Sequence, residues 1–188
     1  MSSERFSAEN RHRLLNEERL KLQPAEEIIA RMKVNADDIV ADLGCGIGYI
    51  TIPLSKKVKR VWALDGQVLM LEDLQKRTPA ELKDKITPII GELPSLPFED
   101  SSLDCAVMVN VAHELEDAHK MAAEIMRCLK NEGILTIVDF NKKPSPFGPP
   151  LAERIEMNEM IELYRPLKLI NKHDCGIYYQ IDLQNSKN

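Results

Sequence analysis

Long apolar runs, aromatic residues and an excess of basic residues are all missing or scarce in this chain of 188 residues. Its apolar segments are much shorter than the roughly 20 residues that cross a membrane, and the opening MSSERFSAEN lacks the apolar core of a signal peptide. The formal net charge of -5 argues against a nucleic-acid partner, because neutralising phosphates requires a basic surface. We therefore expect a cytoplasmic protein that contacts neither a membrane nor a nucleic acid.

Cysteine and histidine are also scarce. The four cysteines show no C-x-x-C spacing, and the four histidines do not combine with them into a ligand pattern. Isolated thiols in a reducing compartment are typical of small buried packing residues. The sequence therefore predicts no metal site and no redox dithiol.

Short apolar runs alternate with amphipathic stretches along most of the chain. Near-continuous apolar runs of this length are typical of strands buried on both faces of a parallel sheet. Five such runs are residues 37–43, 60–65, 86–90, 103–111 and 133–140. After a proline-rich loop and a predicted helix, two last runs lie close enough in sequence to form a hairpin. This alternation predicts an α/β fold with a doubly wound, mostly parallel sheet.

The stretch ADLGCGIGYI follows the first predicted strand and places Gly44, Gly46 and Gly48 at alternate positions. A strand that ends in such a turn and opens a helix is a site for the polar part of a nucleotide-like ligand. A dinucleotide fingerprint would need glycine where the chain has Tyr49. The turn is therefore less suited to a pyrophosphate, and Asp42 at the strand end suits a ligand that carries a cationic amine.

Two further carboxylates follow the next two predicted strands. Asp65 ends the second strand about 20 residues after Gly44, where nucleotide sites place an acid that accepts hydrogen bonds from ribose hydroxyls. Glu92 follows the third strand, where it faces either an adenine amino group or solvent. Three acidic strand ends with no lysine in the glycine turn would repel a phosphate and favour a positively charged nucleoside.

Four segments in order, VADLGCGIGYIT, WALDGQ, GELPSLPFEDSSLDCAVMVNVAHEL and LKNEGILTIVDF, resemble the successive motifs of class I S-adenosylmethionine-dependent methyltransferases. This family includes small UbiE-like members of the methyltransferase type 11 kind. The resemblance runs from about Val34 to Phe140 and implies a Rossmann-like sheet of seven strands whose last strand is antiparallel. It implies S-adenosylmethionine as the cofactor, residues 1–35 as a helical cap of the same domain, and residues 36–188 as the cofactor-binding methyltransferase domain.

The resemblance also implies roles for individual residues on the cofactor side. It places Asp42 near the methionine part of the cofactor and the backbone of residues 44–48 under the ribose and the carboxylate. It places Asp65 on the ribose hydroxyls, and Gly66 and Gln67 beside the adenine. From the residues alone, the alternative for Asp42 is a structural role as a cap of the helix that follows.

Glu92 stands where the family often has aspartate, so the resemblance leaves the adenine contact either to Glu92 or to the backbone of Leu93. Asn110, at the end of the fourth strand, would line the sulfonium side. The complete cofactor-binding set that the resemblance implies is Asp42, Gly44, Cys45, Gly46, Gly48, Asp65, Gly66, Gln67, Glu92, Leu93 and Asn110.

His113 and Glu114 are the titratable groups nearest to the expected position of the methyl group, and we predict that they are catalytic. Each also suits the start of the next helix, so both interpretations stay open. No separate substrate domain is evident, which favours a small-molecule acceptor bound by the N-terminal helices and by a loop over residues 141–155. The motifs leave one alternative, a catalytically silent S-adenosylmethionine-binding module that serves as a regulatory or partner subunit.

Overall fold

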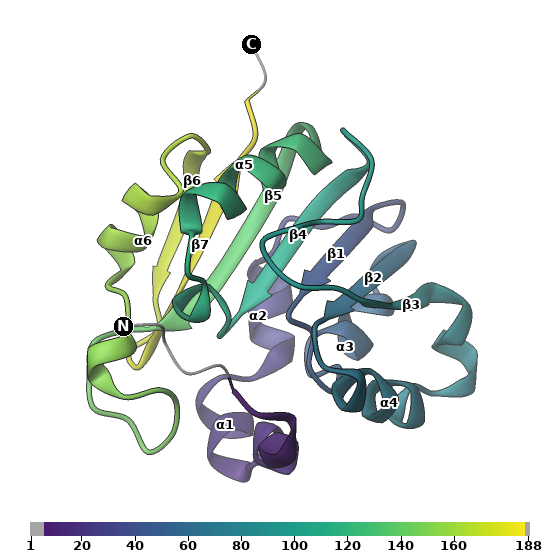
Figure 1. Ribbon diagram of the computed structural model, residues 1–188, viewed down its shortest axis with the longest axis horizontal. Helices are drawn as coiled ribbons and strands as arrows, with labels where there is room; N and C mark the ends of the chain where they lie inside the picture. The colour runs from purple at the N-terminus through teal and green to yellow at the C-terminus, as the bar shows by residue number, and fades with distance from the viewer. Residues whose placement is uncertain (1–5, 187–188) are drawn as a thin grey trace.

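A single seven-stranded sheet forms the centre of the computed structural model, which describes residues 6–186 (Figure 1). The strands are β1 (Ile39–Leu43), β2 (Arg60–Asp65), β3 (Ile86–Ile90), β4 (Leu103–Val109), β5 (Leu129–Phe140), β6 (Lys168–Asp174) and β7 (Tyr178–Gln184). Their order across the sheet is β3-β2-β1-β4-β5-β7-β6. Neighbouring strands from β3 to β5 are parallel, whereas β7 is antiparallel to both β5 and β6. The predicted fold class, with an antiparallel last strand, is confirmed.

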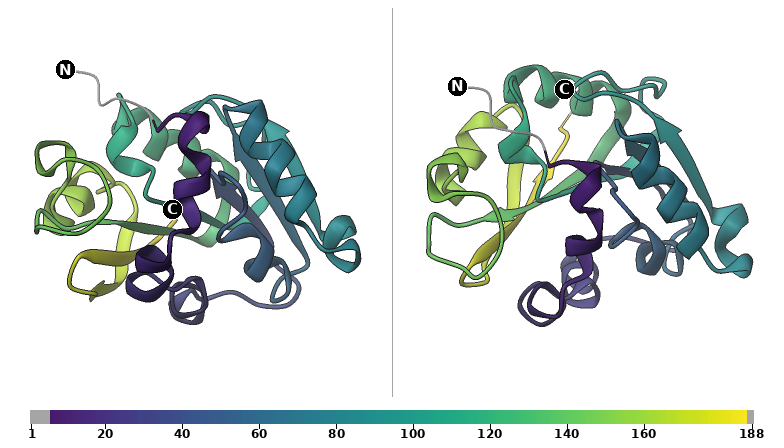
Figure 2. Two further views of the ribbon diagram at one scale, coloured as in Figure 1. Left: turned by 90° about the horizontal axis from the view of Figure 1, so that it is seen from below. Right: turned by 60° about the horizontal axis from the view of Figure 1, so that its bottom comes forward.

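Helices cover both faces of the sheet (Figure 2). The α-helices are α1 (Glu17–Leu22), α2 (Ala25–Arg31), α3 (Thr51–Ser55), α4 (Val68–Arg77), α5 (Ala118–Cys128) and α6 (Met157–Leu163). Short 3-10 helices are η1 (Ala8–Leu15), η2 (Ala80–Lys85), η3 (Ala112–Glu114) and η4 (Leu151–Glu153). Helices α5 and α6 pack on one face, and α2, α3 and α4 pack on the other.

The two covered faces explain why the strand sequences are apolar without alternation. In β1, Val40 packs in the core beneath α2 and α3, whereas its neighbour Ala41 packs in the core beneath α5. Successive side chains of a strand point to opposite faces, so a strand with both faces covered needs apolar residues at every position. Four consecutive residues of β1 are buried as a result.

Two predicted elements have different limits in the structure. Residues 7–22, part of the expected helical cap, divide into η1 and α1, because the side chain of Asn16 caps α1 by accepting a hydrogen bond from the backbone N–H of Arg19 at 2.7 Å. Strand β5 begins at Leu129, several residues before the predicted start, and so follows α5 directly.

The carboxyl ends of β1, β2 and β4 lie side by side at one edge of the sheet. The chain leaves β1 toward β2 on one side and returns to β4 on the other, so β1 and β4 form the point where the strand order reverses. In open α/β sheets this is the place where ligands bind. Figure 1 shows the N-terminal helices beyond the same strand ends. Among the described residues, no helix has the length and apolar character needed to span a membrane.

Gly48 allows a test of how tightly the glycine turn is packed. It has φ +86°, and a Cβ atom there would lie 2.4 Å from Cδ1 of the buried Leu74, whereas Gly176 has φ +83° and open space around it. We expect Gly176→Ala to lower the free energy of unfolding by about 1–2 kcal/mol through backbone strain alone. Gly48→Ala should cost about 1–3 kcal/mol more, because overpacking adds to the same strain. Urea unfolding measures both, and equal losses would show that Leu74 moves aside without cost.

Candidate cofactor and acceptor site

The glycine turn between β1 and α3 has a backbone that only glycine adopts easily. Gly44, Gly46 and Gly48 have φ values of +74°, +53° and +86°. A Cβ atom on Gly44 would lie 2.5 Å from Cγ2 of Val111, so the turn passes close to the end of β4. The backbone N–H groups of Gly44 and Cys45 both donate to the carbonyl oxygen of Leu64, at 2.8 and 3.0 Å. These contacts hold the turn against the end of β2.

Asp65, the last residue of β2, connects this turn to the next one. One carboxylate oxygen accepts a hydrogen bond from the backbone N–H of Gly46, and the other accepts from the backbone N–H of Gln67, each at 2.9 Å. Asp65 is only 7% exposed. The acid that the sequence places on the ribose hydroxyls therefore also fixes the two turns on either side of it.

Asp42 lies at the end of β1 with 2% of its surface exposed. The hydroxyl of Thr51 donates to its carboxylate at 2.6 Å. Burial, together with the charge of Asp65, raises the pKa of Asp42 to about 7, because both effects disfavour the carboxylate form. A cationic group placed beside Asp42 would restore its charge. Asp42 also accepts this bond from the first residue of α3, so the capping interpretation and the ligand interpretation are compatible.

Gln67 ties the N-terminal segment to the turn after β2. Its side-chain oxygen accepts a hydrogen bond from the backbone N–H of Ala8 at 2.7 Å, and its side-chain N–H₂ donates to the carbonyl oxygen of Phe6 at 2.8 Å. Gly66 is half-buried beside it. The segment around η1 therefore lies over the turn that the sequence assigns to the adenine.

The remaining residues of the predicted cofactor set differ in burial. Glu92 is exposed on the loop after β3, and Leu93 is half-buried against the main core. Cys45 is buried in the glycine turn, and burial with the charges of Asp42 and Asp65 raises the pKa of its thiol well above the usual value. Cys45 is therefore a neutral packing residue and not a nucleophile.

Asn110, directly after β4, has a left-handed backbone with φ +58°. Its side-chain amide forms a reciprocal pair with the amide of Gln23, with donor–acceptor distances of 2.8 and 3.0 Å. Gln23 is fully buried, and its carbonyl oxygen accepts a hydrogen bond from the hydroxyl of Tyr49 at 2.6 Å. The connection between α1 and α2 is thus anchored both to the end of β4 and to the end of the glycine turn.

His113, in η3 after β4, is paired with a buried carboxylate. Its ring Nδ1 lies 2.8 Å from one oxygen of Asp139, and its backbone N–H donates to the other oxygen at 3.1 Å. Its Nε2 lies 4.0 Å from an oxygen of Glu114, which accepts a hydrogen bond from the backbone N–H of Phe6. Burial alone lowers the pKa of His113, but Asp139, with Glu114 and Glu153, outweighs it and raises that pKa above its usual value. Because Asp139 can only accept, Nδ1 carries the proton of the neutral ring and Nε2 has the lone pair.

The loop over residues 141–150 is held by the guanidinium of Arg154, which is 4% exposed. Its acceptors are the carbonyl oxygens of Asn141, Lys143, Phe147 and Pro149 and the hydroxyl of Ser145. Phe147 packs edge-on against Phe140, with ring centroids 5.6 Å apart. Arg154 therefore organises the loop at the end of β5 and does not present its charge to an acceptor.

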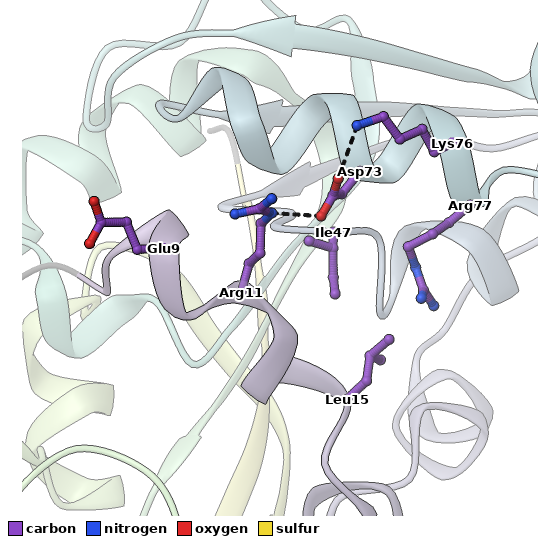
Figure 3. Close-up of a pocket in the computed structure, with 7 residues that line it drawn as sticks. All are labelled: Glu9, Arg11, Leu15, Ile47, Asp73, Lys76 and Arg77. Carbon is purple, nitrogen blue, oxygen red and sulfur yellow. Dashed lines mark hydrogen bonds and ion pairs between the residues drawn. The ribbon is translucent and has the colours of Figure 1, made fainter.

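A groove of about 580 Å³ runs between η1 and α4 (Figure 3). Figure 3 shows Arg11 and Lys76 both directed at Asp73, with distances of 2.6 and 3.4 Å. Ile47 of the glycine turn lines the same groove. The Arg11–Asp73 ion pair attaches η1 to α4 on the outer side of the turn, whereas Lys76 and Asp73 both belong to α4. Within residues 6–186, no cluster of three or more acidic, histidine or cysteine side chains could hold a metal ion.

Sequence reasoning missed three residues that the structure brings to these sites. Asp139 lies near the end of the predicted strand 133–140, and His113 follows the predicted strand 103–111. The rule that the ends of parallel strands meet at one edge of the sheet could therefore have identified Asp139. Thr51 begins the helix after the glycine turn, and Gln23 lies between two charged helices. No sequence signal points to either of them.

Comparison with known proteins identifies the family. Residues 41–137, just over half of the chain, match the family model described as a methyltransferase domain. A demethylmenaquinone methyltransferase of Lactobacillus johnsonii is 30% identical over 125 residues, which cover 64% of this chain and 51% of that protein. The ubiquinone/menaquinone biosynthesis C-methyltransferase UbiE of Marinomonas sp. is 29% identical over 126 residues, covering 62% and 48%. The chain therefore spans about half the length of the curated relatives it matches.

The fold of the whole chain is shared with a solved structure. A SAM-dependent methyltransferase from Aquifex aeolicus superposes with a TM-score of 0.87 at 23% identity, covering 96% of this chain and 99% of that one. The protein thus has the Rossmann-like methyltransferase fold, and by its matching domain it belongs to the class I methyltransferase family, whose cofactor is S-adenosylmethionine. The family resemblance seen in the four sequence motifs is confirmed.

The raised pKa of Asp42 predicts a specific dependence of stability on pH. An aspartate with a pKa near 4 when unfolded and about 7 when folded binds more protons in the folded state between these values. The free energy of unfolding should therefore fall as pH rises from about 4 through 7, by at most about 4 kcal/mol from this residue. His113, whose pKa is also raised, contributes in the same direction.

We expect Asp42→Asn to unfold with a smaller difference in stability between pH 5 and pH 8 than the unaltered protein, as measured by urea titration. The amide oxygen can still accept the hydrogen bond from Thr51, so the variant should fold. An unchanged difference would mean that Asp42 ionises normally despite its burial.

Proposed function

We propose that the protein transfers a methyl group from S-adenosylmethionine to a small-molecule acceptor. The observation that carries this proposal is the arrangement around the glycine turn, where buried Asp42 precedes it and the Asp65 carboxylate lies against Gly46. A turn with positive φ at three glycines lets a ligand approach the backbone, and its two neighbouring carboxylates favour a cationic ligand over a phosphate.

The residues present fit this cofactor. Asp42, whose pKa is raised by burial and by the charge of Asp65, regains its charge beside an ammonium group. The Asp65 carboxylate accepts from two backbone N–H groups, and in this proposal it also accepts from the ribose hydroxyls. In this proposal Gly66, Gln67, Leu93 and the exposed Glu92 form the adenine side.

On the methionine side, Gly44, Cys45, Gly46 and Gly48 contribute backbone, and Asn110 lies toward the sulfonium. Residues 1–35 act as the cap of one domain, and residues 36–188 form its cofactor-binding part. The side chain of Gln67 holds the N-terminal segment over the turn after β2, which supports one domain that includes the cap.

When bound, S-adenosylmethionine supplies a methyl group activated on a sulfonium sulfur, which an acceptor takes by in-line displacement. The chain's task is to orient the acceptor, exclude water and receive a proton if the acceptor carries one. We propose that Nε2 of His113 receives the proton that the acceptor loses. Asp139 orients the ring by accepting a hydrogen bond from Nδ1. Glu114, 4.0 Å from Nε2, would stabilise the protonated imidazole.

A histidine base held by a buried aspartate suits an acceptor with an ionisable hydrogen, such as a phenol or an enol. One relative is named for demethylmenaquinone, so aromatic quinols are the first acceptors to test. A direct test is to incubate the protein with labelled cofactor and a set of phenols and quinols, and then to isolate the labelled product. Cofactor binding without any transfer would favour the silent module instead.

Asp65→Ala tests the cofactor assignment. Loss of a hydrogen-bonded carboxylate should weaken the binding of S-adenosylhomocysteine by about 1.5–3 kcal/mol, the usual value for hydrogen bonds to a charged group. The variant should also be less stable, because two backbone N–H groups lose their acceptor. Isothermal calorimetry measures the affinity, with Asp84→Ala, an exposed aspartate of η2, as the control. Unchanged affinity in a folded variant, or tighter binding of NAD, would refute the assignment.

His113→Ala tests the acceptor side. If His113 receives the proton, turnover should fall about 10²–10⁴-fold while the affinity for S-adenosylhomocysteine stays nearly constant. Asp139→Asn should shift the acid limb of the pH–rate profile to lower pH, because the raised pKa of His113 depends on the charge of Asp139. His119→Ala, which alters an exposed histidine of α5, is the matched control. Normal turnover with reduced thermal stability would make His113 a packing residue.

A further inference from the structure

Arg19 in α1 is the buried cation of the N-terminal cap. It is 8% exposed, and its guanidinium lies over the ring of Tyr49, with Cζ 4.4 Å from the ring centroid. One terminal nitrogen donates to the carbonyl oxygen of Leu14 at 3.0 Å, and the buried Nε has no hydrogen-bond partner. Among the described residues, no carboxylate forms an ion pair with Arg19.

A buried guanidinium without a paired carboxylate lowers the stability of the folded protein. Buried charges in proteins are normally paired, and leaving one without a counter-charge costs several kcal/mol. Burial lowers the pKa of Arg19 to about 10, so it stays charged at neutral pH and still requires an anion. By comparison, Arg11 of the same segment pairs with Asp73 at 2.6 Å, and Arg31 of α2 pairs with Glu27 at 2.9 Å.

The position of Arg19 indicates where the missing anion belongs. Its stacking partner Tyr49 directly follows Gly48, and Leu14, whose carbonyl oxygen it binds, is the side chain nearest to Gly46. Asp42 precedes the same turn. The glycine turn therefore has a buried acid at its start, whose pKa is raised, and an unpaired buried cation at its end.

A ligand with both an ammonium and a carboxylate group satisfies the acid and the cation together. The amino-acid end of S-adenosylmethionine has this charge pattern. Resting on the function proposed above, we propose that Arg19 binds the carboxylate of the cofactor and that this ion pair further stabilises the packing of α1 on the glycine turn. The α1–α2 connection, which Gln23 anchors to Asn110, would be stabilised further by the complete cofactor and less by a ligand that lacks the carboxylate.

The test compares two ligands that differ only in the carboxylate: S-adenosylhomocysteine and its decarboxylated analogue, S-adenosyl-3-thiopropylamine. The unaltered protein should prefer S-adenosylhomocysteine by about 10- to 100-fold, as a charge-assisted hydrogen bond predicts. In Arg19→Met, whose side chain has similar length without charge, this preference should nearly disappear. Arg11→Gln, the matched control in the same segment, should keep it.

Two further readouts separate ligand binding from a structural role. Ligand-free Arg19→Met should have an equal or higher melting temperature, because it removes an unpaired buried charge. Hydrogen exchange over residues 17–23 should slow more with S-adenosylhomocysteine than with the decarboxylated analogue. A preference that survives in Arg19→Met, or a destabilised ligand-free variant, would overturn the proposal.

Arg19→Gln provides a second uncharged variant that can still donate to Leu14, and it should lose the preference in the same way. Retention of the preference in Arg19→Gln would also overturn the assignment. If the unaltered protein binds neither ligand, the proposed function itself fails. If it binds both equally well, the cofactor assignment stands and only the role of Arg19 is wrong.

Discussion

The carboxylate of Asp65 makes the hydrogen bonds on which the proposed cofactor site depends. It accepts hydrogen bonds from Gly46 in the turn after β1 and from Gln67 in the turn after β2. Gln67 in turn holds the segment that leads into η1. Hydrogen bonds to an ionised acceptor are stronger than neutral ones, and Asp65 is almost completely buried. One side chain therefore connects two strand ends and the N-terminal cap.

The same region holds two buried charged groups that are incompletely compensated. Asp42 is buried close to a second carboxylate, and Arg19 is buried without an anion. Neither arrangement favours the ligand-free fold, because each holds a charge away from water without full compensation. Proteins accept such costs at binding sites, where a ligand later supplies the missing partner. In the proposed complex, Asp42 would face the ammonium group of the cofactor and Arg19 its carboxylate.

On the acceptor side, the terminal hairpin has a role that its sequence alone does not suggest. Because β7 lies between β5 and β6, β5 is an inner strand, and Asp139 pairs in register with Tyr179. Asp139 is fully buried. Burial and the nearby charge of Asp139 together raise the pKa of the Tyr164 hydroxyl, which follows α6. The last strands and α6 thus shield the carboxylate that orients His113 from water.

The sequence by itself determined the sheet, the glycine turn and the acidic strand ends, because these depend on local patterns: apolar runs, positive φ at glycine, and position after a strand. Only the tertiary structure decided which distant side chains meet. His113 meets Asp139 because β4 and β5 are neighbours, and Gln23 meets Asn110 because the cap folds back over the strand ends. Arg19 resembles any surface arginine of a charged helix in sequence, and its burial beside Tyr49 depends on long-range packing that no local pattern encodes.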